Sequence, residues 1–512
     1  MDNVNIPAVG IDLGTTFSAI AKLESNGTPM TLVNAEGDRT TPSVALFENG
    51  QAIVGREALK AISTDANSIA LCAKRDMGHK VFHQTLENKQ YPPEVIEAFI
   101  LNKLRRDAET QIGSFSKVVI TVPAYFDEVR RKATQDAGYM AGFEVLDIIN
   151  EPTAAALAFG HQHGMLGQNT AAENVVVYDL GGGTFDVTVM RICGNDFTTL
   201  ATDGDVQLGG FDWDNRLLDY VSEKFVSEFY ADPREETCAR GKLWRECEDA
   251  KRTLSARQKA IITCDYQGLS KRFEITREEF EQMTQDLLDR TRFTTVQTLR
   301  AAGLEWSDVA RVLLVGGSSR MPMVKEMLRQ VTGMESDASS SADEAVALGA
   351  ALHAGHILSL TAGNAPTFKI RNVNSHSLGV IGMDPATRLP RVGVLIPRNT
   401  KLPVKVRRTF KTQKVNQKSI LVQIVEGESS SPDNCTFIGY CKIRNLPPML
   451  PAGSPVEVTF RYTPDGRLKV SVEIPDTDAS TTQEFTRENN LPKSLLDGWR
   501  QYISGEGPTN YQ

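Results

Sequence analysis

The sequence predicts an α/β protein followed by an all-β domain, and two observations favour this division. Up to about residue 362, short β-branched runs such as 118–122 and 175–178 alternate with longer helical patterns, which is typical of α/β layering. After Pro366, segments such as 420–424 and 456–460 alternate or run apolar between Pro, Gly and Asp, as antiparallel strands do. With 512 residues, the chain is long enough for about three domains.

Two smaller features complete the predicted order of elements. A Pro-Asp-Gly turn at 464–466 predicts a hairpin between the strands at 456–460 and 468–472. Near the C-terminal end, four apolar residues between 495 and 503 have helical spacing. So short a helix is marginal alone, and we expect it to dock on another surface.

Composition and charge exclude several classes of protein. Hydrophobic residues make up 41% and charged residues 23%, so the chain is not collagen-like, mainly disordered or a multi-pass membrane protein. The net charge of −8 is unevenly divided, because residues 1–365 carry 36 basic and 51 acidic side chains and residues 366–512 carry 20 and 13. The two regions therefore have different electrostatic tasks.

Three features predict a cytoplasmic protein. The seven cysteines are scattered and form no CxxC pair, which indicates thiols in a reducing compartment. No basic residue precedes Lys22, so we expect no secretory signal. Residues 345–368 lack Lys, Arg, Asp and Glu, but they contain two histidines and three glycines, so we expect a buried helix and a loop rather than a membrane span.

A weak internal repeat relates residues 9–17 to residues 177–185. Each copy is a strand ending in Asp, a Gly/Thr turn and a return strand, so we expect two lobes that each offer a glycine hairpin to a ligand between them. Glycines let backbone N–H groups wrap a phosphate, and Asp12 and Asp179 supply hard oxygen ligands for Mg²⁺. Either hairpin alone is more often an ordinary turn, but two facing hairpins favour phosphate binding.

Two further segments fit a nucleotide site. Asn150 suits a helix cap and Pro152 the first turn, which predicts that Glu151 lies at a helix N-terminus facing the cleft; the alternative is a carboxylate that only offsets the helix dipole. Residues 313–322 predict a buried strand that runs into a glycine turn, either a surface for adenosine below Arg320 or a plain strand-to-helix loop.

Six motifs, in this order along the chain, resemble those of the heat-shock protein 70 (DnaK-type) chaperones: 11–16, 36–43, 121–126, 150–157, 178–186 and 315–322. The resemblance runs from about residue 6 to about residue 486. It implies an actin-like, two-lobed ATPase domain at 1–362, a linker at 363–373, a β-sandwich that binds extended peptides at 374–486, and a short helical tail at 487–512 in place of the long helical lid of the family.

The resemblance also implies roles for single residues around ATP or ADP. The catalytic set is Lys74, Glu151, Asp179 and Thr184. The metal ligands for Mg²⁺, with K⁺ as a further ion, are Asp12, Glu151, Asp179 and Asp186. The nucleotide contacts are Gly14, Thr15, Thr16, Phe17, Gly181, Gly182, Gly183, Gly209, Gly210, Glu248, Lys251, Arg252, Ser255, Gly316, Gly317, Ser318, Arg320 and Asp343. Four of these, from 248 to 255, have a spacing that places them on one helix face.

In the last region, the resemblance implies an apolar peptide groove, although ordinary sandwich core is the alternative for each of its residues. The groove set is Val380, Met383, Phe410, Ile420 and Val422. Between Asp384 and Glu426 there are ten basic residues and no acid. We therefore expect a groove that favours unfolded segments with acidic flanks, and no nucleic acid, because the basic run lacks interleaved aromatic residues.

The residues that would couple the two regions match the family less well. Pro123 and Arg131 stand at positions thought to relay the nucleotide state. Gln135 and Asp147 stand where basic residues commonly contact the linker and the J-domain co-chaperone, and the linker at 368–372 lacks the usual leucine run. The resemblance alone therefore does not establish interdomain allostery, a J-domain partner or a nucleotide-exchange factor.

The function that the sequence predicts is an ATP-dependent molecular chaperone that hydrolyses ATP and binds unfolded polypeptide. A nucleotide-dependent adaptor dedicated to one client, with little turnover, is the alternative. A small-molecule kinase on the same fold is a poor third, because the all-β domain lacks an evident polar substrate pocket.

Overall fold

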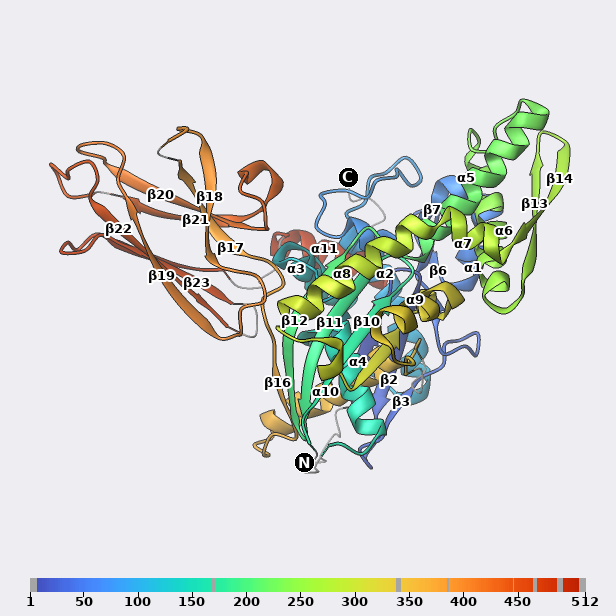
Figure 1. Cartoon of the computed structure of the whole chain (residues 1–512), viewed down its shortest axis with the longest axis horizontal. Coiled ribbons are helices and arrows are strands. Elements are labelled where there is room, and N and C mark those ends of the chain that lie inside the picture. Colours follow the sequence, from blue (N-terminus) through green and yellow to red (C-terminus); the bar gives the residue numbers. More distant parts are fainter. Residues whose placement is uncertain are drawn as a thin grey trace.

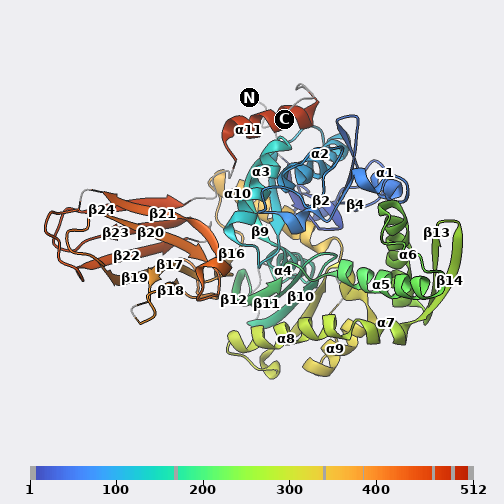
Figure 2. The ribbon, with the colours of Figure 1, turned by 90° about the horizontal axis from the view of Figure 1, so that it is seen from above.

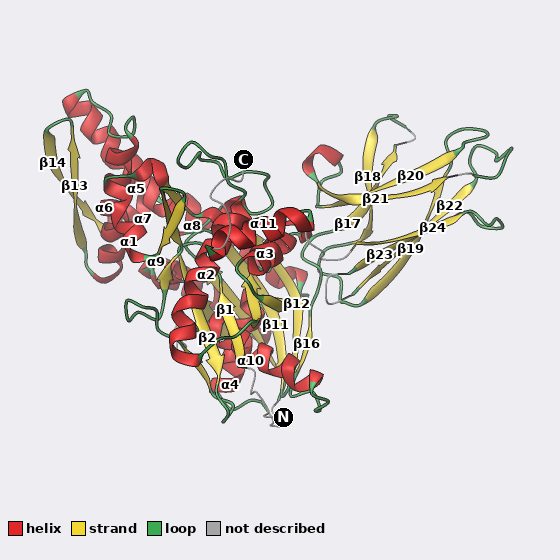
Figure 3. Ribbon diagram, turned by 180° about the vertical axis from the view of Figure 1, so that it is seen from behind, coloured by secondary structure: helices red, strands yellow, loops and turns green. Residues whose placement is uncertain are grey.

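The structure is a computed structural model that describes residues 7–166, 171–337, 342–384, 386–444, 446–463, 467–485 and 491–505. Its first part, residues 7–361, layers helices on sheets and is called the α/β part here. A β-sandwich, called the sandwich part, lies beside it (Figure 1). In Figure 3 most helices lie in the α/β part, while the sandwich part is built mainly of strands. The predicted fold class is confirmed.

The first sheet of the α/β part has the order β3-β2-β1-β8-β9, with β4 paired to β2. β1 and β2 form an antiparallel hairpin, and β1, β8 and β9 run parallel. The strand bounds are β1 Ala8–Asp12, β2 Phe17–Leu23, β3 Pro29–Thr31, β4 Thr41–Pro42, β8 Lys117–Val122 and β9 Glu144–Asn150. The helices α2 (Pro93–Ile112) and α3 (Glu128–Met140) bury their apolar residues against this sheet.

The second sheet repeats this arrangement with the order β15-β10-β11-β12-β16. β10 and β11 form an antiparallel hairpin, and β15 runs parallel to β10. The strand bounds are β10 Glu173–Leu180, β11 Phe185–Cys193, β12 Asp196–Asp205, β15 Arg311–Val315 and β16 Lys369–Arg371. The two copies of the sequence repeat therefore form equivalent strand-turn-strand units, as predicted.

Two helices pack between the sheets. They are α4 (Glu151–Gln162) and α10 (Ala345–Thr361), and α10 also covers β1 and β2. The approach is close, because a Cβ on Gly349 would lie 1.8 Å from the Ala154 carbonyl oxygen. Small residues in α10 permit this contact. Residues 345–368, which lack charged side chains, thus form a buried helix followed by a loop, as predicted. Among the described residues, no helix is long and apolar enough to span a membrane.

The remaining elements of the α/β part extend the two lobes. A small sheet, β6-β5-β7, and the helix α1 belong to the first lobe; the hairpin β13-β14 and the helices α5 to α9 extend the second. The bounds are β5 Val44–Glu48, β6 Gln51–Val54, β7 Ile69–Leu71, α1 Arg56–Lys60, α5 Gly210–Phe229, α6 Thr237–Ala256, β13 Lys259–Tyr266, β14 Leu269–Thr276, α7 Arg277–Met283, α8 Gln285–Ala301 and α9 Pro322–Thr332.

The sandwich part packs two four-stranded antiparallel sheets, β18-β17-β20-β21 and β19-β22-β23-β24, around one core. The strand bounds are β17 Leu378–Met383, β18 Pro390–Ile396, β19 Val404–Lys411, β20 Ser419–Glu426, β21 Thr436–Arg444, β22 Pro455–Tyr462, β23 Leu468–Glu473 and β24 Ser480–Phe485. β22 and β23 pair as the predicted hairpin. Its turn at 464–466 lies outside the described residues.

Two connections tie the sandwich part to the α/β part. The linker strand β16 adds to the edge of the second sheet, parallel to β12, and Phe368 beside it is buried. The C-terminal helix α11 (Lys493–Ser504) lies next to α2 and α3 in the view from above (Figure 2). Its Leu496, Trp499 and Ile503 join the core of the first lobe. This confirms the expectation that so short a helix packs against another surface.

Candidate functional site

A cavity of about 490 Å³ lies between the two lobes. The hairpin turns after β1 and β10 line it, as do α6 and the turn after β15. The residues predicted from the sequence that line this cavity are Asp12, Gly14, Thr15, Thr16, Phe17, Lys74, Glu151, Asp179, Gly181, Gly182, Thr184, Glu248, Lys251, Arg252, Ser255, Gly316, Gly317, Ser318, Arg320 and Asp343. One site thus collects residues from seven separate stretches of the chain.

The two glycine turns face each other directly. A Cβ on Gly182 would lie 2.3 Å from Thr16 Oγ1, and one on Gly183 would lie 2.3 Å from Thr15 Cγ2. Side-chain atoms do not approach this closely, so only glycine lets the turns meet. Gly209 supports the second turn from behind, since its own Cβ would lie 2.5 Å from the Gly183 amide nitrogen. Gly183 and Gly209 therefore shape the cavity without lining it.

Acidic side chains cluster below the turns. Asp12, Glu151 and Asp179 line the cavity, and Asp186 lies opposite Asp179 in the β10-β11 pair. Burial and then repulsion from Glu151 raise the pKa of Asp12 to about 7 and the pKa of Asp186 to about 8. The same causes raise the pKa of Asp179 well above its ordinary value. A cation would relieve this repulsion.

The chemistry of these donors fits Mg²⁺, which prefers carboxylate oxygens together with water and phosphate oxygens. Among the described residues, however, no group of three acidic, histidine or cysteine side chains is placed to hold a metal ion by itself. A magnesium ion here would therefore complete its coordination with phosphate oxygens and water, as is usual for Mg²⁺ bound with a nucleotide.

Lys74 brings a fixed positive charge to these acids. It lies in the 3₁₀ helix η3 (Ala73–Asp76), and its Nζ is 2.6 Å from Glu151 Oε1 with the side chains 3% and 9% exposed. Burial acts to lower the pKa of Lys74, but the carboxylates of Glu151 and Asp12 outweigh it and raise the pKa. The lysine is therefore a buried, oriented ammonium group.

The opposite part of the cavity suits a nucleoside. The helix α6 carries the four expected residues, from 248 to 255, on the face that lines the cavity. Arg252 donates to Glu248 at 2.6 Å, and its guanidinium lies 5.4 Å from the Phe17 ring centroid. Lys251 donates to the Gly210 carbonyl at 2.9 Å and so joins α6 to α5.

Nearly the whole chain matches known proteins. The family model described as "Hsp70 protein" matches residues 8–498. The chain belongs to the Hsp70 family. It is 39% identical over 498 residues to a chaperone protein DnaK from Metamycoplasma hominis, with 96% of this chain and 81% of that protein covered. It is 38% identical over 488 residues to a chaperone protein DnaK from Halobacterium salinarum (strain ATCC 29341 / DSM 671 / R1), with 94% and 75% covered.

The family establishes the predicted general function. This Hsp70 protein is an ATP-dependent molecular chaperone and an ATPase, with the two-lobed ATPase part and the β-sandwich of its relatives. The alternative, an adaptor dedicated to one client with little turnover, is not favoured by these relatives.

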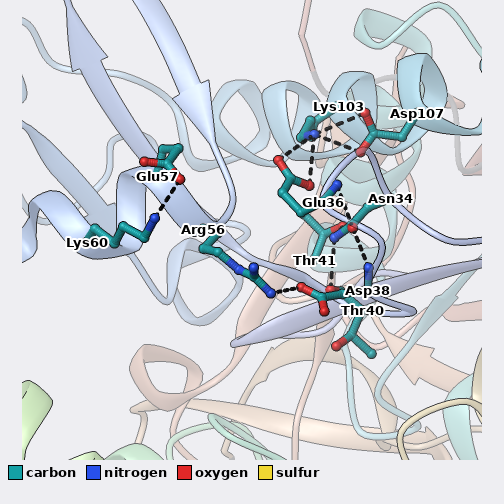
Figure 4. A network of polar contacts seen from close by, with 10 residues as sticks. All are labelled: Asn34, Glu36, Asp38, Thr40, Thr41, Arg56, Glu57, Lys60, Lys103 and Asp107. Carbon is teal, nitrogen blue, oxygen red and sulfur yellow. Dashed lines mark hydrogen bonds and ion pairs between the residues drawn. The ribbon is translucent and has the colours of Figure 1, made fainter.

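The Hsp70 cleft is also bridged at its rim by the loop of the 36–43 motif, to which the sequence analysis assigned no role. Arg39 pairs with Glu344, at the N-terminus of α10, at 3.0 Å across a separation of 305 residues. Its neighbour Thr40 lines the cavity. Figure 4 shows how the loop is fixed to the first lobe, through Lys103 to Glu36 and through Arg56 to Asp38. No spacing rule relates Arg39 to Glu344.

The sequence patterns also did not indicate two charged neighbours of Lys74, which are Arg75 and Glu97. Arg75 donates to the Gly183 carbonyl at 2.8 Å and pairs with Asp212, so it joins η3 to the second glycine turn. Glu97 of α2 is 1% exposed, and burial raises its pKa to about 8 while Lys74 acts to lower it. Glu97 stands in an apolar helical pattern, so its place behind Lys74 follows only from the packing of α2.

The predicted cap of α4 is partly wrong. Asn150 occupies the N-cap position and Pro152 lies in the first turn, but the Asn150 side chain does not cap the helix. Its Oδ1 accepts a hydrogen bond of 2.7 Å from Arg131 instead. The buried guanidinium of Arg131 competes successfully for this oxygen, and Glu151 still points into the cavity at the helix N-terminus.

Arg131 connects the start of α4 to the turn before α3. Besides Asn150, it donates to the carbonyl oxygens of Phe126 at 3.0 Å and Ala124 at 3.1 Å. That turn begins at Pro123, directly after β8. The two predicted coupling residues are therefore in one neighbourhood, between the nucleotide cavity and the sandwich part.

The predicted J-domain and linker positions lie at the domain boundary or near it. Asp147 accepts a hydrogen bond from His353 Nε2 at 2.8 Å, and Gln135 is half-buried on α3. Despite its altered sequence, the linker joins the second sheet through Ile370, which pairs with Phe197 of β12. The unusual residues at these positions thus still allow the linker to dock.

The five predicted groove residues do not form one open surface. Val380, Ile420 and Val422 are buried in the sandwich core, Phe410 packs partly buried against it, and Met383 is 46% exposed. Strand alternation turns the first three inward. For them ordinary core is what the structure shows, and a groove that reaches them stays a prediction.

Proposed function

We propose that Mg·ATP binds between the two glycine turns, with its phosphates on the turns and its adenosine against α6. The observation that carries this proposal is the direct opposition of the turns around a cavity of about 490 Å³. In this arrangement the glycine amides and the hydroxyls of Thr15, Thr16 and Thr184 donate to phosphate oxygens. Arg320, which pairs with Asp343 at 2.5 Å, borders the adenosine.

The acids would hold the metal. Asp12 and Asp179 lie at the ends of equivalent strands, and Glu151 and Asp186 complete the set through water. Magnesium, when bound, neutralises phosphate charge and orients the phosphates. K⁺ as a further ion remains a prediction from the resemblance.

We assign hydrolysis to Lys74. Its ammonium, fixed by Glu151 at 2.6 Å, supplies positive charge where the γ-phosphoryl group develops negative charge, and it positions the attacking water. Positioning and charge are the main contributions a protein makes to phosphoryl transfer. Glu151, Asp179 and Thr184 serve as orienting groups around the same point.

Calorimetry with ATP tests this site. The wild-type chain is expected to bind ATP more tightly with Mg²⁺ than with a chelator, and Asp179→Asn is expected to lose that difference. Asp219→Asn is the matched control, because Asp219 is an exposed acid that pairs with Arg234 outside the cavity. Equal affinity with and without Mg²⁺ in the wild type would contradict the assignment.

We also propose a division of the chain into a nucleotide-binding domain at 1–362, a linker at 363–373, a peptide-binding domain at 374–486 and a tail at 487–512. The separate cores of the α/β and sandwich parts support it. The Arg131 contacts between Asn150 and the turn after Pro123 support a relay of the nucleotide state toward the sandwich.

DnaK-type chaperones bind unfolded polypeptides and work with J-domain and nucleotide-exchange partners, and this chain is expected to bind extended polypeptide at its sandwich. We propose that its clients carry acidic flanks. The ten basic residues that support this are Arg388, Arg391, Arg398, Lys401, Lys405, Arg407, Arg408, Lys411, Lys414 and Lys418. Arg388 lies in the loop between β17 and β18, where the side chain of Leu389 is 63% exposed. Lys414 and Lys418 lie in the loop between β19 and β20, where the side chain of Val415 is 70% exposed.

Binding to a peptide array tests client charge. Peptides with one apolar core and acidic flanks should bind more tightly than the same core with basic flanks, and Lys414→Glu should reduce the difference. Lys325→Glu, an exposed lysine on α9, is the control. Indifference to the sign of the flanks would end the proposal.

We propose a cytoplasmic location and no membrane or nucleic-acid partner. The location is supported by the seven cysteines, all of which are free. A J-domain partner would meet Gln135 and Asp147 in place of the basic residues common in the family, with Asp147 accepting a hydrogen bond from His353.

A further inference from the structure

The contact between α3 and the sandwich part contains two acids that the proposed function does not use. Glu426 ends β20, is 6% exposed, and accepts a hydrogen bond of 3.1 Å at Oε2 from the backbone amide of Glu128. Glu128 is the first residue of α3. Tyr462 of β22 donates to Glu128 Oε1 at 2.7 Å. A carboxyl group of one domain is thus buried against an acid of the other.

The charged groups of the α/β part around Glu426 act in both directions. Asp127 and Glu128 disfavour its ionisation, while Arg131 and the amide of Glu128 favour it. The positive charges nearby are engaged elsewhere. Arg130 pairs with Asp127 at 2.6 Å, and Arg131 donates to two backbone carbonyls and to Asn150. The cations therefore offset the acids only in part.

On the sandwich side, no cation is paired with Glu426 by any contact among the described residues. Glu428 accepts from the amide and hydroxyl of Ser377 at 2.7 and 2.8 Å. His376 is half-buried and donates to the Tyr125 carbonyl at 2.8 Å, and desolvation lowers its pKa. The local groups therefore leave a carboxylate at Glu426 poorly compensated.

A cavity of about 230 Å³ adjoins the pair, and it exists only where the two parts meet. Glu128, Glu426 and Tyr462 line it, and Asp147 and His353 lie in its other wall. A polar cavity of this size holds several water molecules. Glu426 can therefore exchange a proton while the domains are docked.

We propose that Glu426 makes domain docking sensitive to protonation: its neutral carboxyl group fits the docked interface, and its carboxylate weakens it. Burial and the neighbouring Asp127 and Glu128 raise the pKa of Glu426 well above its ordinary value. In the undocked chain this side chain is free of the α3 acids. The docked state therefore binds a proton that the undocked state releases, so docking weakens as pH rises from the ordinary carboxyl pKa to the raised one.

The same linkage between protonation and docking gives the size of the pH effect and identifies His376 as a group with the opposite effect. One proton changes the docking constant by up to about tenfold per pH unit inside that window. His376 acts in the other direction, because its lowered pKa penalises docking as pH falls below its ordinary value. A variant that changes only Glu426 separates the two contributions.

Small-angle scattering of the full chain, at constant ionic strength, measures the docked fraction as a function of pH. In the wild type, the docked fraction is expected to fall as pH rises above the pH range in which His376 titrates. Glu426→Gln keeps an oxygen for the Glu128 amide but cannot ionise, so it should stay docked at alkaline pH. Glu428→Gln is the matched control and should keep the wild-type profile, because Glu428 binds within its own domain.

The proposal is overturned if the wild type and Glu426→Gln have the same pH profile, or if wild-type docking strengthens at alkaline pH. Glu128→Gln provides an independent check. It removes one acid that repels the Glu426 carboxylate, so the docked fraction should fall less at alkaline pH than in the wild type, and an equal fall would also overturn the proposal. Because these measurements use no client and no ATP turnover, their failure leaves the proposed ATPase site untouched.

Discussion

The backbone amide of Tyr125 donates a hydrogen bond of 3.0 Å to the carboxylate of Asp186. The carbonyl of the same residue accepts one of 2.8 Å from His376 Nε2, in the segment between the linker and β17. One peptide segment thus contacts both a proposed metal-site acid and the sandwich part. If a cation binds at Asp186 as proposed, the carboxyl group would change its charge or its partner, and the Tyr125 segment would carry that change toward the interface.

This route predicts the effect of His376→Ala. The variant should hydrolyse ATP at the basal wild-type rate, because His376 does not line the nucleotide cavity. It should lose most of the stimulation by unfolded peptide, since the sandwich no longer holds the Tyr125 carbonyl. Steady-state turnover with and without peptide measures both. Full stimulation in the variant would show that coupling runs through other contacts, such as the hydroxyl of Ser375 on the Ala124 carbonyl.

Replacing Lys74 should separate binding from hydrolysis. We expect Lys74→Ala to bind ATP but to hydrolyse it at least a hundredfold more slowly, which corresponds to about 2.7 kcal/mol of barrier. The physical reason is the loss of the buried ammonium that faces the phosphoryl group. Lys60→Ala, an exposed lysine paired with Glu57, is the control. Unchanged turnover in Lys74→Ala would remove this residue from catalysis.

The acids of the cavity predict a pH dependence for metal binding. Burial raises the pKa of Asp12 to about 7 and the pKa of Asp186 to about 8, both above their unfolded value. The metal-free folded chain therefore holds protons that the unfolded chain releases, and its stability falls as pH rises toward about 8. Bound Mg²⁺ needs the ionised acids and relieves their repulsion.

The gain in melting temperature on adding Mg·ADP should accordingly be larger at about pH 8 than at about pH 6. Thermal unfolding with Mg·ADP, and with ADP and a chelator, checks this at both pH values. An Mg²⁺ effect that is equal at both, or larger at the lower pH, would contradict the assignment of these acids to the metal.

The pair of Arg39 with Glu344 should slow nucleotide release. Arg39→Ala is expected to speed ADP dissociation by up to about fivefold, because an exposed ion pair contributes roughly 0.2–1 kcal/mol. Fluorescent ADP in a stopped-flow experiment measures the rate. Lys60→Ala serves as the comparison on the same lobe, because its ion pair with Glu57 lies within α1. No change for Arg39→Ala would show that the bridge does not restrain the cleft.

The C-terminal helix should depend on Trp499. Trp499 is 9% exposed and packs on Tyr91 with ring centroids 6.0 Å apart. If the helix and the first lobe unfold together, Trp499→Ala should lower the free energy of unfolding by about 3–5 kcal/mol, which is the usual effect of truncating a large buried aromatic side chain. Protease digestion should then cleave the tail more rapidly. Leu495→Ala, at 37% exposed on the same helix, should change little. An equally protected tail in Trp499→Ala would contradict the docking.

Local signals explain why much of the fold and the central site could be predicted. The two hairpins combine β-branched strands with a Gly/Thr turn, so their structure follows from neighbouring residues. The face of α6 follows from helical spacing. The pattern of strands after Pro366 likewise indicated the sandwich, although alternation alone did not distinguish core from groove at Val380, Ile420 and Val422.

Tertiary competition explains what could not be predicted. Asn150 suited a helix cap, but Arg131 takes its side-chain oxygen. Arg39 meets Glu344 only because α10 returns to the first lobe. Glu97 lies behind Lys74 only because α2 packs on η3. In each case the partner lies in another element, and no local spacing encodes the contact.

The central claim is that opposed glycine turns hold Mg·ATP for hydrolysis beside Lys74 and that the sandwich part senses this state. The most direct measurement is the rate of phosphate release from ATP by the full chain, with and without an unfolded peptide, compared with Lys74→Ala. The account predicts slow turnover that the peptide stimulates and that the variant lacks. Phosphate release that is no faster than that of Lys74→Ala, with or without peptide, would contradict it.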